Sequence, residues 1–488
     1  MKYFFLLLIP FLLLSSCKKD KILNDPNAKL AFSTDSVLFD TVFTHVGSVT
    51  KVFKVYNNES QPLNISNIRL AAGAASPFRL NVDGNSGVLL KDMEILAGDS
   101  LYAFVQVTVN PTNQNSPLLI TDEVLFETNG NVQSVYLTAI GQDVYLHKPD
   151  HFPTNGLPPY SIIHCNESRD GAWKNDKPHL IFGLAVVDSG CTLTMLPGTK
   201  VYLHKNAILW VYAYGSLQIR GEHNNEVTFE GDRLEADYKE VPGQWGYIWL
   251  MNGSLNNNIN WAKIKNGAIG VKVGDNSTYP QPSLTMTNTI IKNQKAAAIY
   301  SVGGHITSNN CVFANCGQYV AALTNGGAYH FEQCTFANYW DANPNNASNS
   351  SNASSRATPS IAINNFYKDA NDVVHPNALV SAYFGNCIIS GDLADELLFD
   401  SVATVPFHYT FDHCILKTAL DISNPAHYLS GNMQNANPAF KDANTNNYNL
   451  SSTSQAINNG NTSINVPLDL NINMRDSYPD IGAYELIP

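Results

Sequence analysis

The stretch NNCVFANC at residues 309–316 is followed by a near-copy, EQCTFANY, at residues 332–339. Six copies of the pattern share a small second residue and a bulky apolar fourth residue, and they start at Trp261, Asn288, Asn310, Gln333, Asn386 and His413. The starts lie 27, 22, 23, 53 and 27 residues apart, the longest spacing fitting two turns with an insertion. Repeats of this length predict a solenoid in which each unit packs only against its neighbours. Because the units contain only short strand patterns, we predict a parallel β-helix.

Four copies of the repeat carry a cysteine at the second position: Cys311, Cys334, Cys387 and Cys414. A disulfide framework, a metal site and a stacked core would each produce such a pattern. Without Cys17, seven cysteines are thinly spread over the chain, and Cys311 and Cys316 lack the spacing of a zinc site. Stacked strands hold equivalent Cβ atoms about 4.8 Å apart, slightly too far for an unstrained disulfide. We therefore expect no disulfide framework, and we predict free, inward-pointing repeat cysteines that act as small apolar residues.

Each of the first four copies also has an asparagine five residues after its start: Asn266, Asn293, Asn315 and Asn338. Asparagine tolerates left-handed turns, and its amide can bond to the equivalent amide of the next coil. These residues are expected to form a ladder along one corner of the solenoid.

The region from residue 30 to residue 145 has a different pattern, because apolar and polar residues alternate in it. KVFKVYN at residues 51–57 and LYAFVQVTV at residues 101–109 are examples, and clusters of Gly, Asn and Pro separate such runs. Short alternating strands with turn signals predict an antiparallel β-sandwich. The series at 39–66, 97–111 and 135–143 resembles immunoglobulin-like domains of the abnormal-spindle/Hydin type. This resemblance implies a spacer or an interaction platform.

The later part of the chain, from about 180 to 440, resembles right-handed parallel β-helix proteins of the pectate-lyase-like superfold. The C-terminal stretches NYNLSSTSQAINNGN (447–461) and LDLNINMRDSYPDIGAYE (468–485) resemble the closing segment of bacterial β-helix proteins with a choice-of-anchor Q type ending. Arg475, Asp480 and Glu485 are therefore expected to be cap residues at the open edge of the final coil.

The N-terminus, MKYFFLLLIPFLLLSSCKKD, has a charged start, a short apolar run and small residues before Cys17. The run is too short to span a bilayer and is typical of a secretory signal. Because Cys17 follows Leu-Ser-Ser, the segment resembles a bacterial lipoprotein signal in which Cys17 is lipidated; an ordinary cleaved signal is the alternative. Lys18 favours an outer-membrane destination over the inner membrane, and the choice between the surface and periplasmic faces stays open.

These patterns divide the chain into six parts. We predict a signal peptide at 1–16, an anchor and tether at 17–29, a sandwich at 30–145, a linker at 146–179, a β-helix at 180–440, and a final coil and cap at 441–488. The predicted fold class is all-β, an immunoglobulin-like β-sandwich followed by a right-handed parallel β-helix solenoid. The formal charge of −12 and the absence of a basic cluster exclude nucleic acid as an expected partner.

Aromatic residues alternate with aliphatic ones in two segments of the predicted β-helix. The aromatic positions are Trp210, Tyr212, Tyr214, Trp245, Tyr247 and Trp249. If the aliphatic residues point inward, the aromatics point outward and can stack on sugar rings. Burial of these aromatics under a loop or under the first domain is the alternative.

An acidic stretch, EGDRLEADYKE at residues 230–240, supplies the only candidate metal ligands. One interpretation is a Ca²⁺ site formed by Asp232, Glu235 and Asp237, and the alternative is an ordinary solvated acidic loop. No other cofactor is indicated.

The sequence therefore predicts a protein of the bacterial cell envelope, held to the membrane through lipid on Cys17, whose β-helix binds polysaccharide or another surface partner. Enzymes of this superfold cleave acidic polysaccharides, so a polysaccharide lyase or a glycoside hydrolase is the alternative, although no known catalytic motif is present. A purely structural role also stays open.

Overall fold

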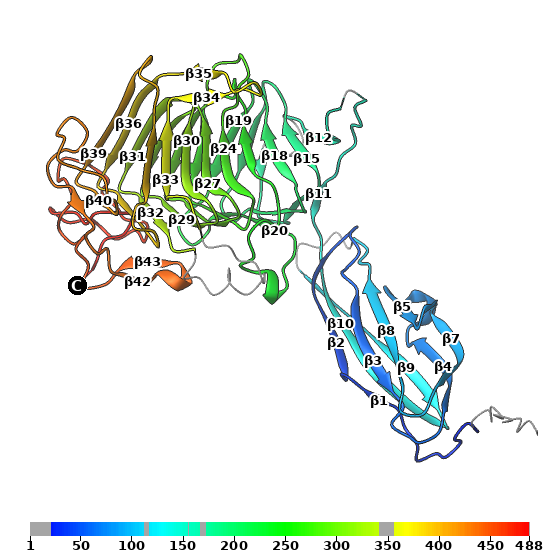
Figure 1. The fold of residues 1–488 in the computed structure, drawn as a ribbon. Coiled ribbons are helices and arrows are strands. Elements are labelled where there is room, and N and C mark those ends of the chain that lie inside the picture. The colour runs from blue at the N-terminus through cyan, green and yellow to red at the C-terminus, as the bar shows by residue number, and fades with distance from the viewer. Residues whose placement is uncertain (1–20, 112–116, 155, 166–171, 341–355, 488) are drawn as a thin grey trace, which may run out of the picture. The chain divides into compact units, whose positions relative to one another are not determined.

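The computed structural model describes residues 21–111, 117–154, 156–165, 172–340 and 356–487 (Figure 1). Within these residues the chain is almost entirely β and divides into two compact units, Met1–Asp143 and Val144–Pro488. Three short 3₁₀ helices interrupt the strands: η1 (Gly73–Ala75), η2 (Ala236–Tyr238) and η3 (Ala443–Thr445). None of the described helices is long and apolar enough to cross a membrane. The predicted signal peptide and Cys17 lie outside the described residues.

The first unit is a β-sandwich of two five-stranded sheets. One sheet has the order β1 (Ala31–Phe32), β3 (Lys51–Tyr56), β8 (Ser100–Val107), β5 (Phe78–Val82) and β6 (Asn85–Ser86). The other has the order β2 (Ser36–Phe43), β10 (Asn131–Gln142), β9 (Leu118–Thr128), β4 (Leu63–Leu70) and β7 (Leu89–Ile95). The alternation seen in the sequence places Phe53 and Val55 in the core and leaves Val52 exposed. The predicted sandwich is confirmed, but it is not wholly antiparallel, because β2 and β10 pair in parallel.

The second unit is a parallel β-helix built from three long sheets (Figure 1). The first sheet contains β11 (Tyr145–His147), β14 (His179–Ile181), β17 (Lys200–Leu203), β20 (Val227–Gly231), β23 (Ala262–Lys265), β26 (Ile290–Gln294), β29 (Val312–Cys316), β32 (Thr335–Asn338), β37 (Ile388–Gly391), β40 (Ile415–Leu416) and β41 (Met433–Gln434). The second sheet contains β12 (Tyr160–Ile163), β15 (Leu184–Val187), β18 (Ile208–Val211), β21 (Ile248–Leu250), β24 (Ile269–Val273), β27 (Ala297–Val302), β30 (Tyr319–Thr324), β33 (Ile361–Asn364) and β38 (Leu397–Asp400).

The third sheet contains β13 (Ala172–Trp173), β16 (Thr192–Met195), β19 (Ser216–Arg220), β22 (Asn257–Asn260), β25 (Ser283–Thr287), β28 (His305–Asn309), β31 (Gly327–Glu332), β36 (Leu379–Gly385) and β39 (Phe407–Asp412). Two antiparallel hairpins complete the unit, β34 (Phe366–Lys368) with β35 (Val374–Pro376), and β42 (Phe440–Asp442) with β43 (Asn447–Leu450). From β11 to β39 each coil contributes one strand to each long sheet, and β40 and β41 extend the first sheet alone. The predicted fold class is confirmed.

The β-helix begins earlier than the sequence suggested. Residues 146–179 were predicted to be a linker, but β12 and β13 lie within them, and β11, β12 and β13 pair in parallel with β14, β15 and β16. The linker prediction is therefore wrong. The prolines that suggested it lie between the strands, at corners where no ladder hydrogen bond is needed.

A disulfide joins Cys165 to Cys191, which the sequence reasoning missed. Cys165 follows β12 and Cys191 follows β15, so both cysteines lie at a corner of the β-helix. Their Cα atoms are 4.9 Å apart. The argument against disulfides assumed parallel side chains on stacked strands, and it does not apply at corners, where side-chain directions vary.

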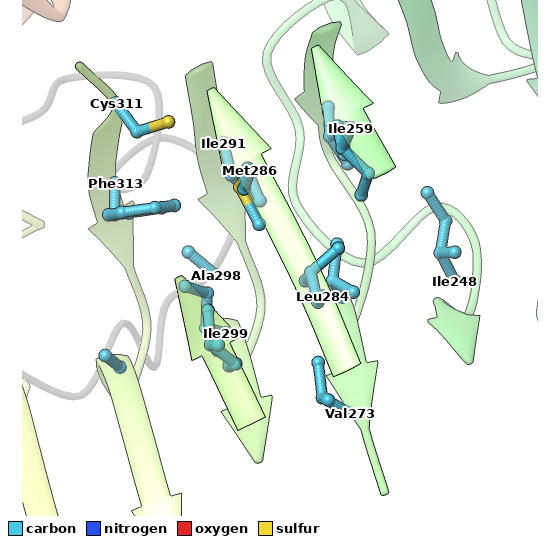
Figure 2. Close-up of a cluster of buried hydrophobic side chains, with 14 of the residues drawn as sticks. Ile248, Ile259, Val273, Leu284, Met286, Ile291, Ala298, Ile299, Cys311 and Phe313 are labelled. Atoms are coloured by element: carbon cyan, nitrogen blue, oxygen red, sulfur yellow. The ribbon is translucent and has the colours of Figure 1, made fainter. Parts of the chain in front are cut away.

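The repeat cysteines lie where the sequence placed them. Cys311, Cys334, Cys387 and Cys414 are free and fully buried. The bulky residues two positions later also stack in register, with Ile291 opposite Phe313 and Phe313 opposite Phe336. Figure 2 shows Cys311, Phe313 and Ile291 among the side chains gathered inside the β-helix. The prediction that the repeat is a stacking register is confirmed.

The predicted asparagine ladder is present only in part, as one amide-to-amide bond at a corner of the β-helix. Asn266, Asn293 and Asn315 have φ values of 66°, 56° and 53°, in the left-handed region. The amide of Asn315 donates to Oδ1 of Asn293 at 2.6 Å, one coil away. Asn338 instead accepts a hydrogen bond from the backbone N–H of Cys316 at 2.9 Å.

The C-terminal segment makes no further coil, which corrects the prediction for residues 441–488. It lies along the outer face of the first sheet, where Val312, Ala314 and Ala337 pack against Leu470 and Tyr484. These apolar side chains point away from the interior and require a cover. The segment therefore covers the side of the β-helix rather than its end.

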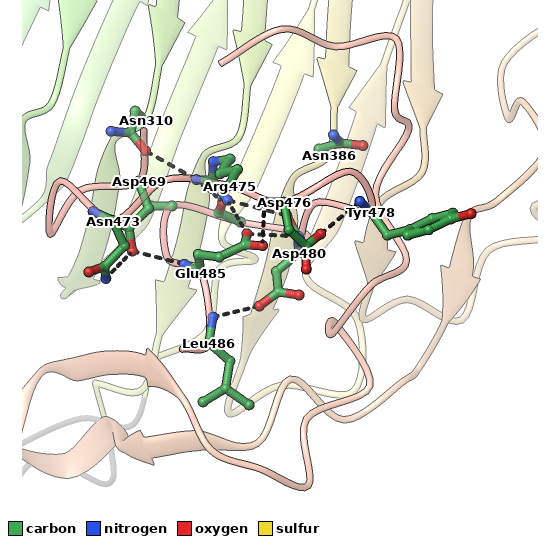
Figure 3. Close-up of polar contacts among 12 residues, drawn as sticks. Asn310, Asn386, Asp469, Asn473, Arg475, Asp476, Tyr478, Asp480, Glu485 and Leu486 are labelled. Carbon is green, nitrogen blue, oxygen red and sulfur yellow. Dashed lines mark hydrogen bonds and ion pairs between the residues drawn. The ribbon is translucent and has the colours of Figure 1, made fainter. Parts of the chain in front are cut away.

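Arg475 and Glu485 hold this segment in place (Figure 3). Their side chains are almost completely buried and form an ion pair of 3.1 Å, and Arg475 also donates to Oδ1 of Asn310 at 3.2 Å. Asp480 accepts hydrogen bonds from the backbone N–H groups of Asn458 and Leu486. All three residues were predicted to cap the open sheet edge, and this prediction is wrong, because they fix the segment against the middle coils.

Candidate functional site

The outer face of the third sheet carries hydrogen-bonding side chains in register, one per coil. The central column of this face consists of Gln218, Asn258, Thr285, Thr307, His330, Tyr383 and Thr410. Their strand neighbours point inward, as Tyr329 and Phe331 do on either side of His330. Thr285 and Thr307 are exposed to solvent. We call this surface the third-sheet face.

Imidazole, carboxylate and phenol groups meet at one end of the third-sheet face. Nε2 of His330 lies 2.9 Å from Oε1 of Glu332, and the His330 ring stacks on Tyr383 with a centroid distance of 4.8 Å. The Tyr383 hydroxyl donates to Asp412 at 2.9 Å, and Nδ1 of His413 lies 2.6 Å from the same carboxylate. We call these five residues the His–Glu cluster.

The electrostatics of the cluster keep its geometry fixed. Burial, together with the hydrogen bond to the Asp412 carboxylate, raises the pKa of Tyr383, so the phenol stays protonated and continues to donate. Asn461 also donates to Asp412, at 2.9 Å. Asp412 is thus held by three donors, while the partly exposed side chains of His330 and Glu332 reach solvent. The cluster can therefore donate hydrogen bonds to a polyhydroxylated ligand and accept them from it.

Trp245 is not part of an outward aromatic row, so that prediction is wrong. Strand β21 begins at Ile248, and Trp245 lies in the corner before it, paired with Gly267. Trp245 is 1% exposed, and its indole N–H donates to the carbonyl of Lys265 at 2.9 Å. The two-residue alternation that holds within β21 does not continue through this corner.

The aromatic residues that do face outward on the second sheet pack against one another. Trp210 and Trp249 stack with a centroid distance of 4.8 Å and an interplanar angle of 9°. Lys272 follows Trp249 in register, and its Nζ lies 4.4 Å from the centre of the Trp249 ring. The two faces of Trp249 are therefore occupied, one by Trp210 and the other by Lys272.

The tyrosines differ from one another in their surroundings. Tyr212 lies edge-on to Trp210 at 5.4 Å, and Tyr247 lies edge-on to Trp249 at 6.5 Å. Tyr214 is 53% exposed. Glycan binding by Trp210, Tyr212, Tyr214, Tyr247 and Trp249 stays a prediction. Trp249 offers no free ring face to a sugar, whereas the third-sheet face presents a hydrogen-bonding side chain in each coil, so the geometry favours the third-sheet face.

The structure does not bring the three predicted calcium ligands together. Asp232 lies 2.6 Å from Nδ1 of His204, and Glu235 forms an ion pair with Arg233. Asp237 lies in the first turn of η2. Among the described residues, no group of three or more His, Cys, Asp or Glu side chains is arranged to hold a metal ion.

Sequence reasoning missed the His–Glu cluster, although one signal was present. The stretch YHFE at 329–332 alternates two aromatics with His330 and Glu332, which predicts that both polar residues point outward. Their partners Tyr383 and Asp412 come from strands about 50 to 80 residues later. Only the register of the coils brings these residues together.

No family model and no curated protein matches this chain. Among solved structures, the catalytic unit of a thermostable GH87 α-1,3-glucanase from Streptomyces thermodiastaticus strain HF3-3 is 11% identical, covers 78% of this chain and 88% of its own, and has a TM-score of 0.26. A GH87 α-1,3-glucanase catalytic domain in complex with nigerose is 12% identical, with coverages of 76% and 82% and a TM-score of 0.18.

A family 123 glycoside hydrolase from Clostridium perfringens is 6% identical, and the match covers 23% of this chain and only 25% of the hydrolase, with a TM-score of 0.17. At such low TM-scores these similarities carry no argument about activity. The function is therefore argued from the chain's own surface.

Proposed function

We propose that this protein is an envelope-anchored lipoprotein whose β-helix binds polysaccharide along the third-sheet face. The observation that carries the proposal is the unbroken column of hydrogen-bonding side chains from Gln218 to Thr410. Neighbouring strands are about 4.8 Å apart, so an extended polymer lying along the axis meets a new donor or acceptor at each coil.

The His–Glu cluster adds fixed recognition groups to this column. The His330 ring is held by stacking on Tyr383, and Glu332 is held by His330. Side chains fixed in this way lose little conformational entropy when they bind hydroxyl groups. By contrast, the C-terminal segment covers part of the first sheet, and on the second sheet the ring faces of Trp210 and Trp249 are in contact with each other.

A glycoside hydrolase is the second candidate function, because the third-sheet face carries two carboxylates. Glu332 and Asp412 lie two strands apart in register, which puts their Cα atoms roughly 10 Å from each other. Inverting glycosidases use carboxyl groups about 6.5–9.5 Å apart as acid and base. Binding is better supported, because three donors already hydrogen-bond to Asp412, whose side chain is only 10% exposed.

A screen of the purified protein against neutral and acidic polysaccharides separates these functions. We expect retardation in affinity gels that contain at least one polysaccharide, without release of reducing or unsaturated sugar ends. Sugar ends that are released by the wild type but not by Glu332→Gln would establish that the protein is an enzyme instead. If the protein neither binds nor cleaves any of the polymers, a structural role would replace both proposals.

The envelope location and the lipid anchor on Cys17 are part of the proposal. The Cys165–Cys191 disulfide supports it, because such bonds persist mainly in oxidising compartments outside the cytoplasm. In the native bacterium, Cys17→Ala is expected to prevent lipidation and to move the protein from the membrane fraction to the soluble fraction. Retention of this variant on membranes after a high-salt wash would contradict the anchor.

A further inference from the structure

A pocket of about 440 Å³ lies at the corner where the third sheet turns into the first sheet. Asn260, Trp261 and Asn309 line it from the coils, and Leu468 and Ile472 line it from the C-terminal segment. Its volume falls within the range of about 300–1,000 Å³ that is typical of small-molecule sites. The C-terminal segment thus supplies one wall of a cavity in addition to covering apolar residues.

Two bulky residues of this pocket have left-handed backbone conformations. Trp261 has a φ of 51°, and Ile472 has a φ of 60°. At the corner positions equivalent to Trp261, three other coils carry the residue best suited to this conformation, namely Asn288, Asn310 and Asn386. Non-glycine residues with such strain gather at functional sites, especially when they are aromatic or β-branched.

The fold makes specific room for Trp261. A Cβ atom on Gly221 would lie 2.0 Å from the carbonyl oxygen of Trp261, so only glycine fits at this position. The ring of His223 lies edge-on to the Trp261 indole with a centroid distance of 5.2 Å. Nδ1 of His223 is buried and has no hydrogen-bond partner among the described residues.

Several polar groups of the pocket are available to a ligand. Oδ1 of Asn260 accepts from Thr287 at 2.7 Å and from Asn288 at 3.0 Å, which leaves its amide N–H groups free within the described structure. The side chain of Asn309 makes no hydrogen bond to another described residue. These amides face an apolar wall that contains Leu468 and Ile472.

The charges of the pocket select against anions. No lysine or arginine is among its lining residues, all of which lie in the described part of the chain. The carboxylate of Asp469 is occupied, since it accepts from the backbone N–H groups of Asn471, Asn473 and Glu485. Glu222 is the remaining carboxylate, and it repels a uronate or a phosphate.

From these contacts we infer that the corner pocket binds a single neutral hexopyranose unit. The apolar C–H face of the sugar lies against Trp261 and Ile472, and its hydroxyl groups bond to Asn260 and Asn309. This inference goes beyond polysaccharide binding on the third-sheet face, because the pocket would hold one sugar even if that face bound none.

Ligand-observed NMR titrations with methyl hexopyranosides of gluco, galacto and manno configuration, and with methyl glucuronide, test the inference. We expect at least one neutral glycoside to bind more tightly than the glucuronide. Asn309→Ala should weaken that binding about tenfold, which corresponds to about 1.4 kcal/mol. Asn276→Ala is the matched control, because Asn276 lies outside both the pocket and the third-sheet face and likewise makes no side-chain hydrogen bond within the described residues. The affinity of this variant should equal that of the wild type.

A second variant separates binding from folding. Ile472→Asn places a residue that tolerates the left-handed conformation at an exposed position, so Tm should stay the same or rise while the affinity for the glycoside falls. Failure of all three neutral glycosides to bind, preference for the glucuronide, or equal effects of Asn309→Ala and Asn276→Ala would each overturn the inference. If Ile472→Asn lost binding and also had a lower Tm, this result would count against the inference as well.

Discussion

Trp245→Ala is expected to destabilise the β-helix by about 3–5 kcal/mol, the usual range for a fully buried tryptophan. The substitution leaves a cavity among core side chains and removes the hydrogen bond from the indole to the carbonyl of Lys265. Chemical denaturation, followed by circular dichroism, measures this loss as a lower denaturant midpoint with little change in slope.

Trp249→Ala is the matched control, because Trp249 lies on the outer surface of the second sheet, four residues after Trp245, and is only partly buried. We expect a clearly smaller loss for this variant, since no interior cavity forms. Equal stability of Trp245→Ala and the wild type would show that Trp245 is exposed, as the sequence pattern suggested, and would contradict the position of the corner before β21.

Arg356→Met is expected to destabilise the protein by about 3–5 kcal/mol, because it leaves a buried carboxylate without its counter-charge. The side chains of Arg356 and Glu396 are both 0% exposed, and their ion pair has a distance of 2.6 Å. Glu396 also accepts hydrogen bonds from Ser360, at 2.8 Å from the backbone N–H and 2.7 Å from the hydroxyl. Thermal and chemical unfolding of the purified variant check this expectation.

Arg233→Met provides the comparison for this ion pair. Arg233 and Glu235 are partly exposed, and such pairs contribute about 0–1 kcal/mol. The double variant Arg356→Met with Glu396→Gln removes both charges and should recover part of the lost stability. Similar losses for Arg356→Met and Arg233→Met would show that Glu396 is not buried as the structure has it.

The repeat carried most of the information about the β-helix, because stacking in register is a local and periodic property. The positions of Cys311 and Phe313 follow from a spacing that can be read directly from the chain, as does the bond between Asn315 and Asn293. The same reasoning failed at corners. It extended the alternation of β21 to Trp245 and expected no disulfide framework, although the chain turns at Trp245 and at Cys191.

The candidate sites depend on contacts that no local pattern contains. Asp412 meets Tyr383 because β39 pairs in parallel with β36, which places Asp412 opposite Gly385, two residues after Tyr383. The C-terminal segment returns to pack on coils more than 100 residues earlier, as the bond between Arg475 and Asn310 shows. A single sequence gives the composition of such a segment, but not the face on which it docks.

Affinity electrophoresis of Thr307→Arg on the polysaccharides that retard the wild type is the most direct test of binding on the third-sheet face. Thr307 is exposed in the middle of the central column, so a long cationic side chain blocks a bound polymer without disturbing the core. Thr228→Arg on the first sheet is the matched control. We predict at least a tenfold loss of affinity for Thr307→Arg and wild-type affinity for Thr228→Arg. Equal retardation of Thr307→Arg and the wild type would contradict the account.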